Sequence, residues 1–148
     1  MTDAELNAMS PLALAHVGDA VFDLLVRTKL CTEGKLTAGD LHRETVRHVS
    51  AVSQAAAAKK LMDLLTEQES RVFRRGRNAH SHPAPKGASP MEYHAATGLE
   101  ALFGWLYLRG DRERMEELFA RLMEDTPLRS LRRKSLLPTA LPSGLPTA

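Results

Sequence analysis

Apolar residues recur at helical spacing along almost the whole of this 148-residue chain. Alternating runs of β-branched residues between turn residues, which would indicate strands, are nearly absent. Hydrophobic residues make up 43% of the chain and charged residues 26%, an ordinary composition for a globular domain of this length. We therefore predict a single all-α domain built as a helical bundle.

Start and stop signals divide this pattern into helices. Ser10 and Pro11 form a good helix start, because Ser suits the N-cap and Pro suits the first helical position. Asp40 and Asp111 are the N-caps that we expect for two later helices, and Gly76 should break a third. The expected helices cover residues 11–29, 38–50, 50–66, 67–76, 91–108 and 111–123.

Two segments lack the signals of regular structure. Residues 80–90 contain three prolines and a glycine and should form a long loop. Residues 1–125 are expected to form the folded domain, and residues 126–148 a flexible tail that is first basic and then rich in Pro, Leu and Thr.

Composition also limits the environment of the chain. The one cysteine, Cys31, excludes an internal disulfide framework or a Cys-rich zinc site and fits a reducing cytosol. The N-terminus lacks the pattern of a signal peptide, and no apolar run approaches the roughly 20 residues that span a bilayer. We therefore expect a soluble, cytoplasmic protein without a membrane partner. The formal net charge of +2 argues neither for nor against a nucleic-acid partner.

A Gly-Asp pair interrupts the first long helix. Apolar residues cover most of the circumference of this helix, so it should be packed on several sides. Gly18 would let another backbone or a ligand approach closely beside Asp19. The alternative is that Asp19 belongs to a solvated strip with Asp23, which can pair with Arg27 four residues on.

A second acid lies in the helix expected over residues 91–108. Glu100 is the only charged residue between Ala95 and Leu108, and a glutamate is almost never fully buried without a partner. That partner could be a cationic side chain, a metal ion or another subunit. The interpretation that we favour is that Asp19 and Glu100 converge and share one Mg²⁺, since this ion takes one or two carboxylates and leaves its other positions to water and substrate phosphate.

A strongly basic stretch lies between the two acids. Positive side chains of this kind bind phosphates and supply affinity without sequence information, and amide and imidazole groups can bind sugar hydroxyls or base edges. The alternative is a merely solvated charged face. We regard His80 and His82 as RNA contacts or solvent-exposed residues and not as metal ligands. The candidate RNA-binding residues are Arg74, Arg75, Arg77, Asn78 and Lys86.

These segments resemble the catalytic domain of the ribonuclease III family. "HVGDAVFDLLVR" is similar to its signature helix, and "GLEALFGWLYLRGD" is similar to its second acidic helix. Together with "LHRETVRHVSAVSQA" and "RRGRNAHS", and without a double-stranded RNA-binding domain, the chain resembles the compact bacterial branch called Mini-ribonuclease III. The resemblance covers roughly residues 9–122.

This resemblance implies an all-α homodimer with a valley for double-stranded RNA and one Mg²⁺-dependent site in each subunit. It implies a hydrolase that leaves 5′-phosphate ends and matures the ends of 23S ribosomal RNA precursor, with the need for a ribosomal protein left open. By motif, Asp19 would be the catalytic acid and a metal ligand, and Glu100 the second metal ligand. The chain departs from full-length enzymes at Ala15 and Thr97, where those enzymes carry acids, so the number of ions stays open.

Two other functions remain as alternatives. The same scaffold could be a catalytically silent RNA-binding or ribosome-assembly protein, or a helical protein-interaction module that pairs Glu100 with a cation. For the homodimer, the apolar surface of the first long helix suggests a subunit contact, and we expect Phe22 and Val26 to lie in it.

Overall fold

The protein is described here from a computed structural model that covers residues 1–34, 36–79 and 83–124, and these residues form helices and turns without a strand. The prediction of an all-α fold is therefore confirmed. The elements are α1 (Asp3–Ala8), α2 (Pro11–Glu33), α3 (Ala38–Val49), α4 (Ala51–Leu61), the 3-10 turn η1 (Met62–Leu64), α5 (Glu67–Arg77), α6 (Pro90–Arg109) and α7 (Arg112–Met123).

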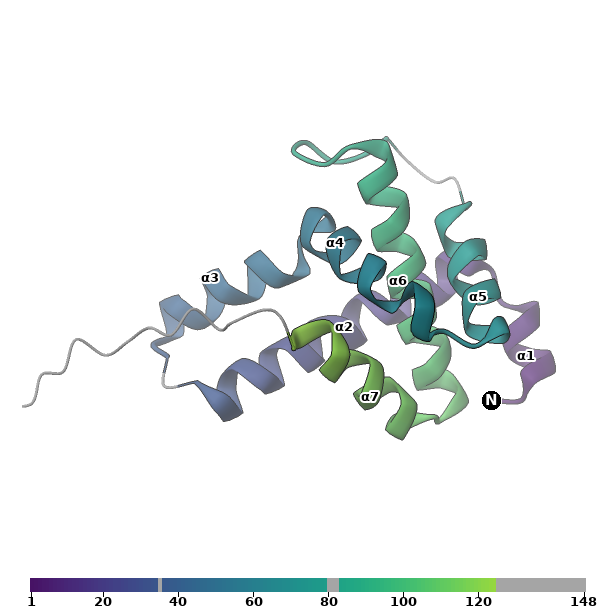
Figure 1. Ribbon diagram of the computed structural model, residues 1–148, viewed down its shortest axis with the longest axis horizontal. Helices are drawn as coiled ribbons and strands as arrows, with labels where there is room; N and C mark the ends of the chain where they lie inside the picture. Colours follow the sequence, from purple (N-terminus) through teal and green to yellow (C-terminus); the bar gives the residue numbers. More distant parts are fainter. Residues whose placement is uncertain (35, 80–82, 125–148) are drawn as a thin grey trace, which may run out of the picture.

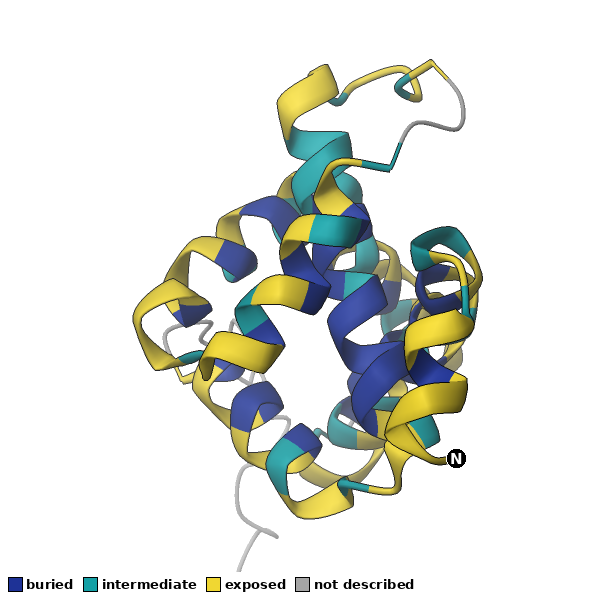
Figure 2. Ribbon diagram, turned by 90° about the vertical axis from the view of Figure 1, so that its right-hand side faces the viewer, coloured by how far each residue is buried: buried dark blue, intermediate teal, exposed yellow. Residues whose placement is uncertain are grey.

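Helix α6 forms the centre of the bundle. It packs against α2, α4 and α5 along its length and also contacts α1 and α7 (Figure 1). Its middle section is buried almost all round, and Figure 2 shows buried residues on the inner sides of the surrounding helices. Phe103 of α6 meets Phe22 of α2 edge to face at 5.4 Å, and Phe22 meets Phe119 of α7 at 5.8 Å. This aromatic cluster joins three helices in one core.

A buried ion pair fixes α5 against α7. Glu69 is 4% exposed, and its two carboxylate oxygens accept hydrogen bonds from Nε and Nη2 of Arg114 at 2.8 and 3.0 Å. Burial opposes ionisation of Glu69, but the hydrogen bonds from Arg114 and Thr66 hold its pKa below the usual range. The orientation of α5, which carries the arginine-rich segment, is thus tied to the core.

Several helix ends agree with the sequence signals and others differ. Ser10 and Asp111 cap α2 and α7 as expected. Helix α3 is capped by Thr37, whose hydroxyl accepts a hydrogen bond from the N–H of Asp40, so the expectation of Asp40 as N-cap was wrong. The short helix α1, with a Thr2–Glu5 capping box, was not predicted.

The expected break at Gly76 is also wrong, because α5 continues through it to Arg77. Gly76 instead allows close packing of α5 on α6. A Cβ atom at this position would lie 2.6 Å from Cβ of Ala101 and 3.1 Å from Cα of Gly98. The glycine signal therefore reports a tight contact between helices rather than a helix end.

The surface of α2 differs from the one inferred for the subunit contact. Phe22 is 2% exposed and Val26 is fully buried, both in the core of the chain, so neither can lie in a contact between subunits. Leu24 is a large hydrophobic residue of α2 that is exposed, and it borders a hollow that Tyr107 also lines. A helix that is apolar nearly all round does not reveal which side faces its own core.

Some expectations concern parts of the chain outside the described residues. The flexible tail expected over residues 126–148 lies there, as do His80 and His82. Of the loop expected over residues 80–90, the described residues 83–89 are irregular as expected. Among the described helices, none combines the length and the apolar character needed to cross a membrane.

Candidate active site

Helices α2 and α6 cross in direct backbone contact. A Cβ atom on Gly18 would lie 1.6 Å from the carbonyl oxygen of Glu100, and one on Gly104 would lie 2.0 Å from the carbonyl oxygen of Leu14. Any side chain at either glycine would push the helices apart, since a Cβ cannot approach a backbone oxygen this closely. The glycine before Asp19 is therefore explained by the approach of the second acidic helix.

This crossing sets Asp19 beside Glu100. The pKa of Glu100 is raised to about 7, first because its carboxyl group is largely buried and second because the negative charge of Asp19 lies nearby. The convergence of the two acids is thus present in the structure. Asp19 is exposed, as in the alternative of a solvated strip, and only Glu100 is partly withdrawn from water.

The third group at this place is Gln54 of α4. Its side chain is 1% exposed and lies against Glu100, where it favours the ionised carboxylate. Its Nε2 atom is nevertheless buried without a well-formed hydrogen bond. A buried N–H donor that lacks a well-formed hydrogen bond costs about 1–3 kcal/mol of folding free energy.

Among residues 1–34, 36–79 and 83–124, no cationic side chain pairs with Glu100. Burial, Asp19 and Gln54 are the influences on its pKa, and none of them supplies a positive charge. Within the part of the chain that the structure describes, the alternative of a buried salt bridge to Glu100 therefore finds no support. Ala15 of α2 and Thr97 of α6 are buried and carry no carboxylate. The hydroxyl of Thr97 donates a hydrogen bond to the carbonyl oxygen of Tyr93 at 3.0 Å.

The neighbouring acid Asp23 has a local partner. Its carboxylate accepts a hydrogen bond from Nε of Arg27 at 3.0 Å, in the expected i,i+4 pair. This pair is well exposed, so it adds at most about 1 kcal/mol to stability. No group of three or more acidic, His or Cys side chains that could enclose a metal ion occurs among the residues that the structure describes. The arrangement is a two-carboxylate site.

The arginine-rich end of α5 presents only some of the expected residues to solvent. Arg74, Arg77 and Asn78 are exposed, and Lys86 is exposed in the loop that follows. Arg75 is half-buried, and its Nη2 donates to the carbonyl oxygen of Met9 at 3.3 Å. Arg75 therefore fastens α5 to the turn before α2 and differs from the free cation that its sequence position suggested.

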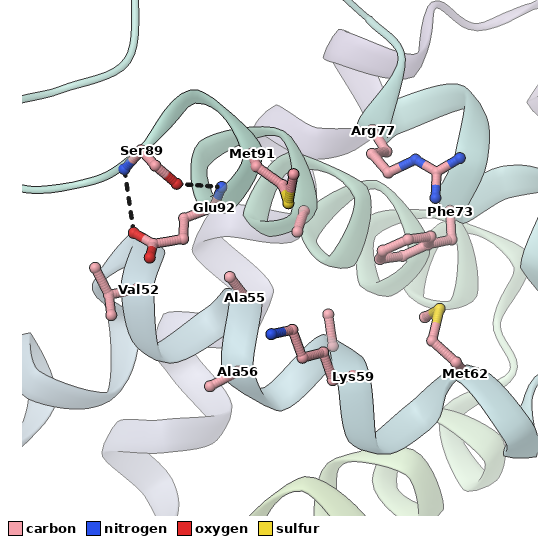
Figure 3. A pocket seen from close by; sticks show the side chains of 12 residues that line it. Val52, Ala55, Ala56, Lys59, Met62, Phe73, Arg77, Ser89, Met91 and Glu92 are labelled. Atoms are coloured by element: carbon pink, nitrogen blue, oxygen red, sulfur yellow. Dashed lines mark hydrogen bonds between the residues drawn. The ribbon is translucent and has the colours of Figure 1, made fainter.

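An apolar groove lies between α4, α5 and α6 (Figure 3). Its volume is about 450 Å³, and Met62, Phe73 and Met91 form part of its walls. The cationic side chains of Lys59 and Arg77 border it, with Arg77 at the side formed by α5. Lys59 is exposed, and its charge adds to the positive charge of the arginines near the end of α5.

Comparison with known proteins identifies the family. The model of the Ribonuclease III domain matches residues 12–111. A Mini-ribonuclease 3 from Symbiobacterium thermophilum is 52% identical over 110 residues, which cover 74% of this chain and 85% of that protein. The chain belongs to the ribonuclease III family. It is an endoribonuclease, similar to the Mini-ribonuclease 3 proteins.

A further relative and a solved structure agree with this result. A Mini-ribonuclease 3 from Synechocystis is 44% identical over 115 residues, which cover 78% of each protein. A crystal structure of a protein from Fusobacterium nucleatum superposes with a TM-score of 0.72 at 28% identity, covering 78% of this chain and 93% of that one. The span that matches the family model contains both Asp19 and Glu100.

Sequence reasoning missed two residues of this ribonuclease III domain. Gln54 was hidden in an alanine-rich helix, although it shares a face with the buried residues Ala58 and Leu61. A polar residue at such a buried position is the signal that could have found it. Lys59 lies outside the basic stretch around Arg77 and comes near Arg77 only because α4 and α5 both pack against α6.

Proposed function

We propose that this endoribonuclease cleaves double-stranded RNA in a Mg²⁺-dependent reaction, with Asp19 and Glu100 as the metal ligands and catalytic acids. The observation that carries the proposal is the meeting of these two carboxylates at the α2–α6 crossing, where the negative charge of Asp19 and burial raise the pKa of Glu100. A divalent cation relieves this repulsion and makes the ionised form of Glu100 favourable.

The residues present fit Mg²⁺. Two carboxylates without nitrogen or sulfur ligands suit a hard cation that keeps several positions for water and phosphate. When bound, the ion would lower the pKa of a water molecule and stabilise the charge that builds on a cleaving phosphodiester. Asp19, which is exposed, would meet the ion from the solvent side. Glu100, which is partly buried, would hold it from the interior.

The RNA would be held chiefly through its phosphates. Arg74, Arg77 and Lys86 offer exposed positive charge, and Asn78 offers an amide at the end of α5. Such contacts give affinity that depends on salt and carries little sequence information. That suits a duplex, which proteins recognise mostly by its shape and backbone. Arg75 contributes by holding α5 in place.

We further propose that residues 1–125 are the catalytic domain and act as a homodimer in the cytoplasm. A twofold dimer can present one site to each strand of a duplex, and the exposed Leu24 and Tyr107 offer an apolar surface for the subunit contact. The substrate that we infer from the family resemblance is the precursor of 23S ribosomal RNA, cut at its 5′ and 3′ ends. A ribosomal protein could present this substrate to the enzyme.

The test is cleavage of a duplex RNA with Mg²⁺ by the unmodified chain and by Glu100→Gln. We expect the unmodified chain to cut both strands and leave 5′-phosphate ends, and the variant to bind the same RNA without cutting it. Glu92→Gln, which changes the side chain that accepts a hydrogen bond from the N–H of Ser89 in the capping box of the same helix, serves as the control and should keep activity. An unmodified chain that binds duplex RNA but never cuts it would support the silent RNA-binding alternative.

A further inference from the structure

We propose that Gln54 is a positioning residue whose amide holds the Glu100 carboxylate in the orientation that a divalent cation requires. This inference rests on the proposed function of Glu100 as a metal ligand. It assigns a role to the buried amide of Gln54, which has no part in the catalysis or the RNA binding proposed above.

The packing of α4 against α6 explains how Gln54 reaches Glu100. Ala55, Ala58 and Leu61 are buried on α4, and α4 packs along α6. Gln54 is 1% exposed among these apolar groups. A glutamine at such a position cannot turn its amide to water, so its partner must lie within the protein.

The state of the amide nitrogen indicates what that partner is. Nε2 carries two N–H donors, yet it is buried without a well-formed hydrogen bond. The carboxylate of Glu100 lies against it and is influenced by it. A small turn of the carboxylate would bring one oxygen to Nε2 and leave the other oxygen free for a cation. Carboxylates that bind metals are commonly hydrogen-bonded in this way, and their orientation depends on it.

A purely structural role fits Gln54 less well. An amide that only stabilises the fold would have its donors satisfied by backbone or side-chain acceptors in the folded chain. Gln68 provides a contrast, because it is exposed, so its amide N–H groups can reach water, and its Oε1 accepts a hydrogen bond from Arg109 at 3.2 Å. Gln54 instead keeps its donors beside an acid. Replacing it with an apolar group of the same shape should therefore leave the metal-free fold intact.

The experiment compares the full chain with Gln54→Met, which keeps the length of the side chain and removes the amide. Binding of Mn²⁺ is measured by calorimetry without RNA, and thermal unfolding is measured without metal. We expect Mn²⁺ to bind the variant about 10-fold or more weakly, while its melting temperature stays equal or rises. Gln68→Leu is the matched control and should bind Mn²⁺ as the unmodified chain does.

Gln54→Asn provides a second variant in case Gln54→Met does not fold. It keeps an amide that is one carbon too short to reach Glu100, so we expect the same weaker binding of Mn²⁺. Unchanged Mn²⁺ affinity in a folded Gln54 variant would overturn the positioning role while leaving the proposed function intact. If the unmodified chain itself bound no Mn²⁺, both the metal site and the role of Gln54 would be overturned.

Discussion

Gly18 of α2 and Gly104 of α6 meet backbone to backbone. A Cβ atom added to Gly104 would lie 2.9 Å from the amide nitrogen of Gly18 and 2.0 Å from the carbonyl oxygen of Leu14. No side chain separates the two helices here, so the acids that flank the crossing come together. The position of Asp19 relative to Glu100 therefore depends on two residues that carry no side chain.

The first prediction concerns this crossing. Gly104→Ala should lower the free energy of unfolding by 1–3 kcal/mol or more, because the new methyl group forces the helices apart, and it should reduce RNA cleavage as well. Gly39→Ala is the control, since its Cβ would meet only Nη1 of Arg43 at 3.6 Å within α3. Urea unfolding gives the comparison. Equal stability of the two variants would contradict a tight crossing.

The second prediction concerns the pH dependence of stability. The pKa of Glu100 rises from 4.5 to about 7 in the folded chain, so the folded state holds its proton more tightly than the unfolded state. Glu100 therefore costs stability that grows as pH increases from about 4.5 to about 7, reaching about 3 kcal/mol. Without metal, Glu100→Gln should be more stable than the unmodified chain at pH 8.

The same measurement has an internal control. Well below pH 4.5, about pH 3, where Glu100 is protonated in both states, the difference between the two proteins should shrink toward zero. Adding Mg²⁺ at pH 8 should stabilise the unmodified chain and leave Glu100→Gln unchanged. A variant that is less stable than the unmodified chain at every pH would be inconsistent with a raised pKa.

The third prediction separates two neighbouring arginines. Arg74→Ala removes an exposed charge and should reduce the slope of log affinity for duplex RNA against log salt by about 1. Arg75→Ala removes the hydrogen bond to Met9 and should lower the melting temperature with a smaller change in that slope. Binding titrations at several salt concentrations without Mg²⁺ measure both. Identical behaviour of the two variants would refute this division of roles.

The fourth prediction concerns assembly. Leu24→Asp places a charge on the exposed apolar surface of α2 and should convert a dimer into a folded monomer, as measured by light scattering after size exclusion. Phe22→Asp places a charge in the core beside Phe103 and Phe119 and should unfold the chain. An unchanged mass for Leu24→Asp would exclude Leu24 from the subunit contact.

The approach of Asp19 and Glu100 could be predicted from the sequence because a buried acid and a helical glycine each constrain the packing. Glu100 is the only charged residue in an apolar stretch of its helix, and a buried acid of this kind needs a partner from another part of the fold. Gly18 indicated close approach at a defined place. Together with the cap signals at Ser10 and Asp111, these features predicted the long helices and the site between them.

Other features depend on packing that periodicity does not encode. Helix α2 is apolar on nearly every side, so its pattern could not show that Phe22 faces the core while Leu24 faces solvent. Arg75 looks like its neighbours in sequence and differs only because Met9 lies within its reach. Gln54 lies in an alanine-rich helix whose buried face becomes apparent only once α6 is beside it.

The most direct measurement is a calorimetric titration of Mg²⁺ into four proteins: the unmodified chain, Asp19→Asn, Glu100→Gln and the double variant. If the two carboxylates share one ion, each single variant should lose most of the affinity and the double variant should lose little more, so the effects will be strongly non-additive. Additive losses, or Mg²⁺ binding that survives either single change, would mean that Asp19 and Glu100 do not form one metal site.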